Sequence, residues 1–211
     1  MKRFDPHRFD PRQCRVELDE FKALLASRSI LEESKHIRPF FERRAHISAF
    51  FGSYISDIIT YDRIAHQLVL GGDFTCDLAV GDSKRLAYCL VEFEDATENS
   101  VFRKNGQKAT REWAPRFEHG YSQIVDWFFK LDDIKQTSEF EHQFGRNATY
   151  YGILIAGRRQ FLAASEQERL VWRSRKVLVD SRRVYCLTYD DLYEDLNDCW
   201  QNYDPAFQTN L

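Results

Sequence analysis

The stretch from Tyr150 to Ala156 is the feature that most restricts the fold of this 211-residue chain, because it is an unbroken apolar run of strand length. A strand that is apolar at every position has both faces buried, which is typical of the centre of a sheet covered by helices. The segment before it predicts one such helix, since apolar residues recur at helical spacing across 115–131.

The other segments predict a mixed β-sheet flanked by α-helices, which is an α/β fold. Helical patterns cover about 18–25, 30–51, 115–131, 165–173 and 190–200, and strand patterns cover 67–70, 74–80, 86–93, 150–156 and 184–187. A turn at 81–84 joins the second and third strands, and the polar stretch 96–111 predicts a mobile loop. We expect an N-terminal extension over 1–29 and a single domain over 30–211.

Composition excludes several classes of protein. The chain is 43% hydrophobic and 15% aromatic, enough for a large core, and its net charge of −3 predicts nucleic-acid binding only if Lys and Arg gather on one face. Five cysteines without C-x-x-C spacing argue against a disulfide framework or a zinc site. With no signal peptide, membrane-length apolar run or P-loop in the sequence, we expect a cytoplasmic protein without membrane association or a nucleotide cofactor.

The strand at 86–93 leads into two carboxylates that period two places on one face, Glu92 and Glu94. Asp77 adds a third acid within the apolar strand before it. Neighbouring carboxylates repel each other, and a hard divalent ion with oxygen ligands relieves that repulsion. The alternative is an edge strand whose solvated face carries acidic residues.

The expected register complicates this grouping. A tight turn at 81–84 places Asp77 opposite Tyr88 and Asp73 opposite Glu92. Asp77 therefore joins the site only if the strands splay or a bulge shifts the register.

Four further residues are candidates for polar roles. His119 and Gln123 lie on the predicted 115–131 helix, where Gln123 could orient a water or a phosphate, although both suit ordinary polar helix positions. Arg158 and Arg159 follow the apolar strand, where sites of α/β sheets occur, and could hold DNA phosphates. The alternative for the arginines is a solvated strand terminus.

Five local patterns, taken in order, cover about residues 30–197. They are Arg38-Pro39-Phe40-Phe41 with the helix that follows, the stretch Leu70–Leu78, the stretch Leu90–Glu94, the stretch His119–Trp127, and the stretch Gly152–Arg158 with the later Leu187–Leu192. Together they resemble the Shedu family of anti-phage nucleases, in the PD-(D/E)XK nuclease superfamily.

This resemblance implies a restriction-endonuclease-like fold and a metal-dependent DNA endonuclease in anti-phage defence. It places Asp77 at the first acid of the superfamily, Glu92 at the second, Gln123 at a supporting helix position and Glu42, loosely, as an additional acid. It further implies Mg²⁺ or Mn²⁺ as cofactor, DNA as partner, and a homo-oligomer, either dimer or tetramer.

One position departs from the family pattern. The superfamily usually has Lys two residues after the second acid, where it stabilises the transition-state charge. Here that residue is Glu94, so another cation such as Lys104 or Lys108 replaces it, or the metal is held differently, or catalysis is weak. Two other classes therefore stay open: a catalytically silent module that senses DNA or a protein, and an interaction protein with a solvated acidic edge.

Overall fold

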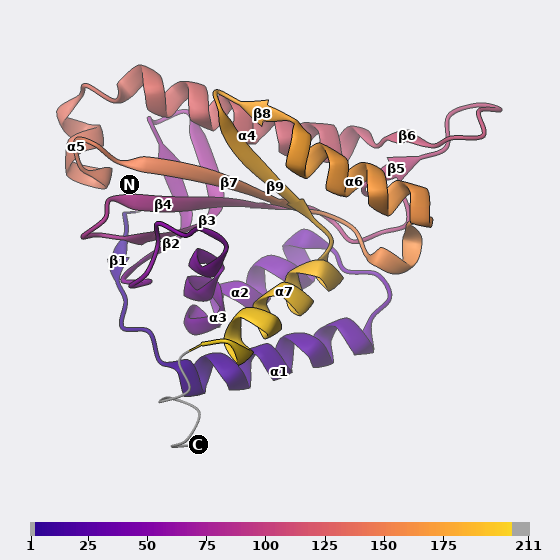
Figure 1. Ribbon diagram of the computed structural model, residues 1–211, viewed down its shortest axis with the longest axis horizontal. Coiled ribbons are helices and arrows are strands. Elements are labelled where there is room, and N and C mark those ends of the chain that lie inside the picture. The colour runs from indigo at the N-terminus through magenta and orange to yellow at the C-terminus, as the bar shows by residue number, and fades with distance from the viewer. Residues whose placement is uncertain (1–2, 204–211) are drawn as a thin grey trace.

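A seven-stranded mixed sheet runs through the centre of the molecule in the order β1-β2-β3-β4-β7-β9-β8 (Figure 1). The computed structural model describes residues 3–203. The strands are β1 (Asp5–Pro6), β2 (Arg63–Leu70), β3 (Phe74–Asp82), β4 (Ala87–Phe93), β7 (Thr149–Ile155), β8 (Leu178–Val179) and β9 (Arg182–Leu187). Strands β1 to β4 are antiparallel, whereas β4, β7 and β9 are parallel, with β7 central as its apolar sequence predicts. The predicted α/β class is confirmed.

Helices cover both faces of the sheet (Figure 1). The upper layer comprises α4 (Pro115–Ile134), α5 (Ser138–Phe144) and α6 (Ala164–Lys176), and the lower layer comprises α1 (Pro11–Ser27), α2 (Arg38–Glu42), α3 (Ala45–Phe50) and α7 (Tyr189–Gln201). The short helical turns are η1 (Glu33–Ile37), η2 (Phe51–Tyr54) and η3 (Arg159–Phe161). A separate hydrophobic cluster fills the space between the sheet and each layer. None of the helices in residues 3–203 has the length and apolarity needed to cross a membrane.

Helix α1 is part of the lower layer, although the sequence places it in an N-terminal extension. Cys14, Leu18 and Phe21 are fully buried in the lower core. The helix begins after Asp10, whose carboxylate accepts hydrogen bonds from the backbone N–H groups of Arg12 and Gln13, as is typical of an N-cap.

Several predicted boundaries of helices and loops differ from those in the structure. The helix expected at 30–51 is divided into η1, α2, α3 and η2. The helix expected at 165–173 begins earlier, at Ala164, where the Glu166 carboxylate accepts the Ala163 N–H at 2.9 Å. The polar stretch 96–111 contains the start of a hairpin, β5 (Phe102–Arg103) with β6 (Glu112–Trp113), and is not simply a loop.

The turn between β3 and β4 lies later than the sequence predicts, because Asp82 organises it. This buried carboxylate accepts the N–H groups of Lys84 and Arg85 on one oxygen, each at 3.0 Å, and those of Ile59 and Thr60 on the other, at 3.1 and 3.0 Å. Strand β3 therefore continues to Asp82, which pairs with Ala87. The register moves by four residues, an even number, so each side chain keeps its face.

We expect Asp82→Asn to destabilise the protein. Burial alone raises the pKa of Asp82, but the four N–H donors outweigh it and lower the pKa to about 2. A lowered pKa stabilises the folded state above the unfolded-state value, and this contribution is lost as pH falls from about 4 to 2. The expected loss at pH 7 is about 2 kcal/mol. Urea unfolding at pH 7 and pH 3 measures it, and a difference that does not shrink at pH 3 would contradict this account.

Candidate active site

Asp77 and Glu92 lie where β3 and β4 separate. The last paired residues are Leu78 and Val91, so Asp77 and Glu92 would form the next pair of this register. The predicted opposition of Asp77 to Tyr88 is wrong, since Tyr88 pairs with Gly81. Instead of a strand partner, the Asp77 carboxylate accepts the Phe93 backbone N–H at 3.0 Å.

An irregularity in β2 directs Asp77 toward the end of β4. Gln67 has a φ of +56°, and its side-chain amide donates to the Asp77 carboxylate at 2.7 Å. Ile64 packs in the lower core and Leu68 in the upper core, although their even spacing would place them on one face of a regular strand. Strand β2 therefore rotates about its own axis at Gln67, and the Asp77 carboxylate on neighbouring β3 accepts a hydrogen bond from the Gln67 side chain at this point.

Glu92 is a buried carboxyl group without a hydrogen-bond donor. Its exposed fraction is 7%, and no donor within residues 3–203 bonds to it. Burial chiefly raises its pKa to about 10, and the charges of Asp77 and Glu94 raise it further. Burial also raises the pKa of Asp77 to about 6, opposed by the Phe93 N–H.

Glu94 faces the start of α4, where an arginine gathers several acids. Arg116 contacts the Glu94 carboxylate through Nε, Glu33 at 2.9 Å and Asp95 at 3.2 Å. Gly120 follows one turn later, and a Cβ atom there would lie 3.1 Å from Glu94 Cγ, so the absence of a side chain makes room for Glu94. Burial raises the pKa of Glu94 to about 7 even though Arg116 lowers it.

Two arginines supply the positive charge of this site, and sequence reasoning missed both. Besides Arg116, Arg38 at the start of α2 lies 3.1 Å from Glu33 and 3.8 Å from Asp77. The two lysines considered as replacements for the superfamily lysine lie elsewhere. Lys104 is exposed, and Lys108 pairs with Glu112. Arg38 belongs to the Arg38-Pro39-Phe40-Phe41 pattern of the family resemblance, and that pattern could have indicated it as a site residue. Arg116 reaches the site only through the packing of α4.

We call the group formed by Glu33, Arg38, Asp77, Glu92, Glu94, Asp95 and Arg116 the acidic cluster. The structure brings Asp77, Glu92 and Glu94 into it, together with Glu33 and Asp95, which were not predicted. Tyr189 of α7 supports it by donating its hydroxyl to the Glu94 carbonyl at 2.7 Å.

The remaining acidic and polar candidates lie outside the cluster or at its margin. Gln123 is half-buried and follows Gly120 by one turn, on the side of α4 that carries Arg116. His119 is exposed on the same helix. Glu42 is exposed at the end of α2, and Asp73 is exposed in the turn after β2, paired with Lys130 at 2.7 Å.

Arg158 and Arg159 are engaged by acids of α7, and their assignment to DNA phosphates stays a prediction. Arg158, 7% exposed, donates to Asp190 at 2.9 and 3.0 Å and to the Arg28 carbonyl at 2.7 Å. Arg159 pairs with Asp191 and Glu194. These contacts attach α7 to the end of β7. The sequence of the strand gives no sign of them, because the acidic partners of the two arginines belong to a helix later in the chain.

The donors of the acidic cluster suit Mg²⁺ bound with few protein ligands. Within residues 3–203, no three acidic, histidine or cysteine side chains are arranged to close on one metal ion. Mg²⁺ usually keeps several waters and uses one or two carboxylates plus substrate phosphates. Asp77 and Glu92, whose charges interact across the gap between β3 and β4, could form such a pair, whereas Glu94 is held by Arg116.

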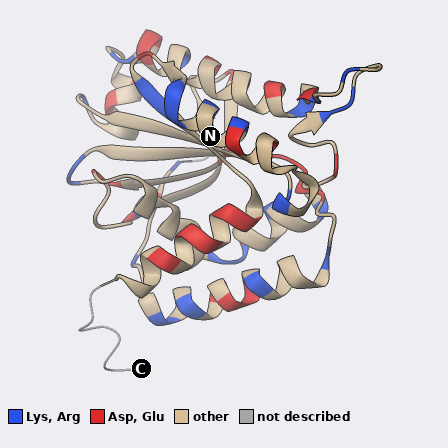
Figure 2. Ribbon diagram, turned by 45° about the vertical axis from the view of Figure 1, so that its right-hand side comes forward, with Lys and Arg blue, Asp and Glu red and all other residues tan. Residues whose placement is uncertain are grey.

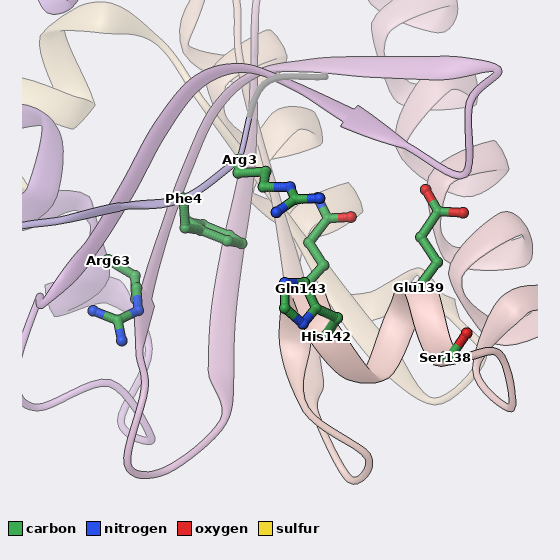
Figure 3. A pocket seen from close by; sticks show the side chains of 7 residues that line it. All are labelled: Arg3, Phe4, Arg63, Ser138, Glu139, His142 and Gln143. Atoms are coloured by element: carbon green, nitrogen blue, oxygen red, sulfur yellow. The ribbon is translucent and has the colours of Figure 1, made fainter.

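A pocket of 660 Å³ lies away from this cluster (Figure 3). It opens between the N-terminal segment and α5, and it is lined by Arg3, Phe4, Arg63, Ser138, Glu139, His142 and Gln143. The Phe4 ring lies 5.1 Å from the ring of Tyr88, in the first half of β4, while the acidic cluster is at the other end of that strand. The pocket therefore contains none of the predicted site residues.

A known protein family matches most of the sequence. No curated protein matches the sequence. Residues 31–193 match the family described as Shedu protein SduA, C-terminal. The matched region contains every member of the acidic cluster and all strands of the sheet except β1. Since the match covers most of the sequence and the fold is the one the resemblance implies, the chain belongs to the Shedu family.

Proposed function

We propose that this protein is a metal-dependent endonuclease that hydrolyses DNA phosphodiester bonds. Shedu membership associates the chain with anti-phage defence. The observation that carries the proposal is Glu92, a buried carboxyl without a hydrogen-bond donor that faces Asp77 at a strand end. Burying a carboxylate is costly unless a cation compensates it. A divalent cation beside Asp77 would displace the proton that Glu92 holds at neutral pH and compensate its charge.

Asp77 and Glu92 are the residues proposed to hold Mg²⁺ or Mn²⁺. When bound, such an ion polarises the phosphate and lowers the pKa of a coordinated water. Gln67 and the Phe93 N–H orient the Asp77 carboxylate, so that it stays directed toward Glu92. Gln123 is placed to orient water or phosphate from α4.

Arg116 is proposed to supply the positive charge that Lys provides elsewhere in the superfamily. Its side chain is about half exposed at 47%, and its guanidinium is held by Glu94, Asp95 and Glu33. A fixed cation beside a phosphate stabilises the charge that develops in the transition state. This role would explain why an acid replaces the superfamily lysine at position 94. Glu94 holds Arg116, and Arg116 brings the positive charge from α4 instead.

Plasmid nicking tests the proposal directly. Purified protein is incubated at low salt with Mg²⁺ or Mn²⁺ and with supercoiled plasmid, linear duplex or single-stranded DNA. We expect metal-dependent cleavage that EDTA stops. Absence of cleavage of all three substrates with both metals would contradict the proposal.

Metal binding should release protons and strengthen with pH. In the metal-free protein the pKa values of Asp77, Glu94 and Glu92 are about 6, 7 and 10, so at pH 7 the cluster retains protons that a bound cation displaces. Mn²⁺ titration calorimetry at pH 7 in buffers of different ionisation enthalpy should report at least about one proton released per ion. Cleavage at limiting metal should rise between pH 6 and 8. A binding enthalpy independent of the buffer would rule this linkage out.

A catalytically silent DNA sensor is the second candidate, favoured by the pairing of Glu94 with Arg116 where a catalytic Lys is usual. It predicts DNA binding that weakens with salt and survives Glu92→Ala, with no cleavage by the wild type. Self-association into a dimer or tetramer, expected from the resemblance, stays a prediction that sedimentation analysis can check.

A further inference from the structure

The hairpin formed by β5 and β6 projects from the molecule as an arm (Figure 1). Every residue from 103 to 110 is exposed. Between Arg103 and Glu112 there are four basic residues and one acid, in a chain whose net charge is −3. Figure 2 shows these basic positions along the arm, standing away from the acidic stretches of α7. We refer to residues 102–113 as the basic arm.

The base of the basic arm is attached by stacked aromatic rings. Phe102 and Trp113, its two end residues, have ring centroids 4.4 Å apart, and Trp113 stacks on Phe117 of α4 at 4.8 Å. The Arg169 and Arg173 guanidinium groups of α6 lie 5.3 and 4.8 Å from the Trp113 ring. Such contacts are each favourable by roughly 0.5–1 kcal/mol.

Ion pairs and hydrogen bonds hold the returning strand of the arm as well. Arg111 donates to both carboxylate oxygens of Glu166 and to the Phe161 carbonyl at 2.7 Å. Arg169 in turn donates to the Arg111 carbonyl at 2.8 Å. Arg111 is therefore part of the attachment, whereas Arg103, Lys104 and Lys108 extend from it with exposed side chains, of which Lys108 pairs with Glu112 within the arm.

The basic arm starts beside the acidic cluster. Asp95 accepts the Gly157 N–H through its carbonyl at 3.0 Å, and a Cβ on Gly157 would lie 2.7 Å from the Val101 side chain, next to the arm. On the other side, only Ala114 and Pro115 separate Trp113 from Arg116 of the cluster. Lys108 lies five residues before Trp113, and the chain bends at Ala109 and Thr110. The two residues are therefore less than roughly 16 Å apart, the length of five fully extended residues, which is about the axial rise of five phosphates of one DNA strand.

We propose that the basic arm binds the phosphate backbone of duplex DNA beside the acidic cluster and so positions the strand for cleavage. Charge complementarity selects the partner, since exposed Lys and Arg side chains on a fixed hairpin match a linear polyanion, and the length of the arm suits several successive phosphates. This inference rests on the proposed function for its role in cleavage, but the binding itself does not require catalysis.

The test measures binding in EDTA, where no metal-dependent cleavage can occur. Fluorescence anisotropy with a labelled 30-base-pair duplex is recorded from 50 to 300 mM salt for the wild type and for Arg103→Gln/Lys104→Gln/Lys108→Gln. The triple variant should raise Kd roughly tenfold or more and reduce the slope of log K against log salt by about 2–3. The matched control is Lys22→Gln/Lys84→Gln/Arg85→Gln, which removes the same charge from exposed positions on α1 and on the β3–β4 turn.

Unchanged Kd and slope in the arm variant, an equal loss in the control variant, or an arm-dependent interaction with RNA duplex but not DNA would each overturn the inference. Melting temperatures of both variants should match the wild type, because the substituted side chains are exposed. Failure of the proposed function is distinguishable, since it leaves arm-dependent binding intact while the wild type does not cut DNA with any metal.

Discussion

Glu92→Gln is expected to abolish metal-dependent cleavage and, at the same time, to raise the stability of the metal-free protein. Cleavage should fall by at least about 10³-fold, because the variant loses a charged ligand of the metal. The stability gain follows from the raised pKa of Glu92: the folded state keeps a proton that the unfolded state releases above about pH 4.5. Stability is therefore lost as pH rises from about 4.5 to 10, and glutamine removes this dependence.

The size of the gain depends on pH. At pH 7 the cost of holding the proton is roughly 3 kcal/mol, which corresponds to an increase of about 6–12 °C in Tm for a chain of this length. The gain should vanish below pH 4.5, where both states are protonated. Mg²⁺ should raise the Tm of the wild type and not that of the variant.

Differential scanning fluorimetry with and without Mg²⁺, combined with plasmid nicking, measures all of these effects. Glu168→Gln on the exposed face of α6 is the matched control and should change neither activity nor Tm. A variant that loses activity together with stability would indicate that Glu92 is a structural residue, and the assignment would fail.

Arg116→Ala is expected to reduce kcat by about 10²–10³-fold with a modest effect on stability. The kinetic loss reflects the removal of a cation that stabilises the transition-state charge. Stability changes little because the guanidinium is about half exposed, where ion pairs contribute at most about 1 kcal/mol each. Arg116→Lys should recover part of the activity, since it restores the charge without the planar geometry.

Kinetic constants at saturating Mg²⁺ separate catalysis from metal affinity. Arg44→Ala serves as the control, because Arg44 likewise pairs with a glutamate, Glu20, on the surface. Equal activity of Arg116→Ala and the wild type would show that the position next to Glu94 needs no cation, and the proposed replacement of the superfamily lysine would be wrong.

The sequence alone determined the type of fold and the strand that carries the site. Unbroken apolar character placed β7 in the interior of the sheet, since only a strand covered on both sides is apolar throughout. Period-two spacing placed Glu92, in β4, and Glu94, just after it, on one face of the sheet, and that result survives the error in the predicted turn because the register moved by an even number of residues.

Tertiary structure decided which charges meet. The side-chain bonds of Asp82 moved the turn and placed Asp77 beside Glu92, and those bonds come partly from backbone groups of Ile59 and Thr60 more than twenty residues away. Arg116 reaches Glu94 only because α4 packs across β4 and β7, and Arg158 is engaged by α7 for a similar reason. Local pattern reports which face of an element is buried, whereas the partner of each buried charge depends on how distant elements pack.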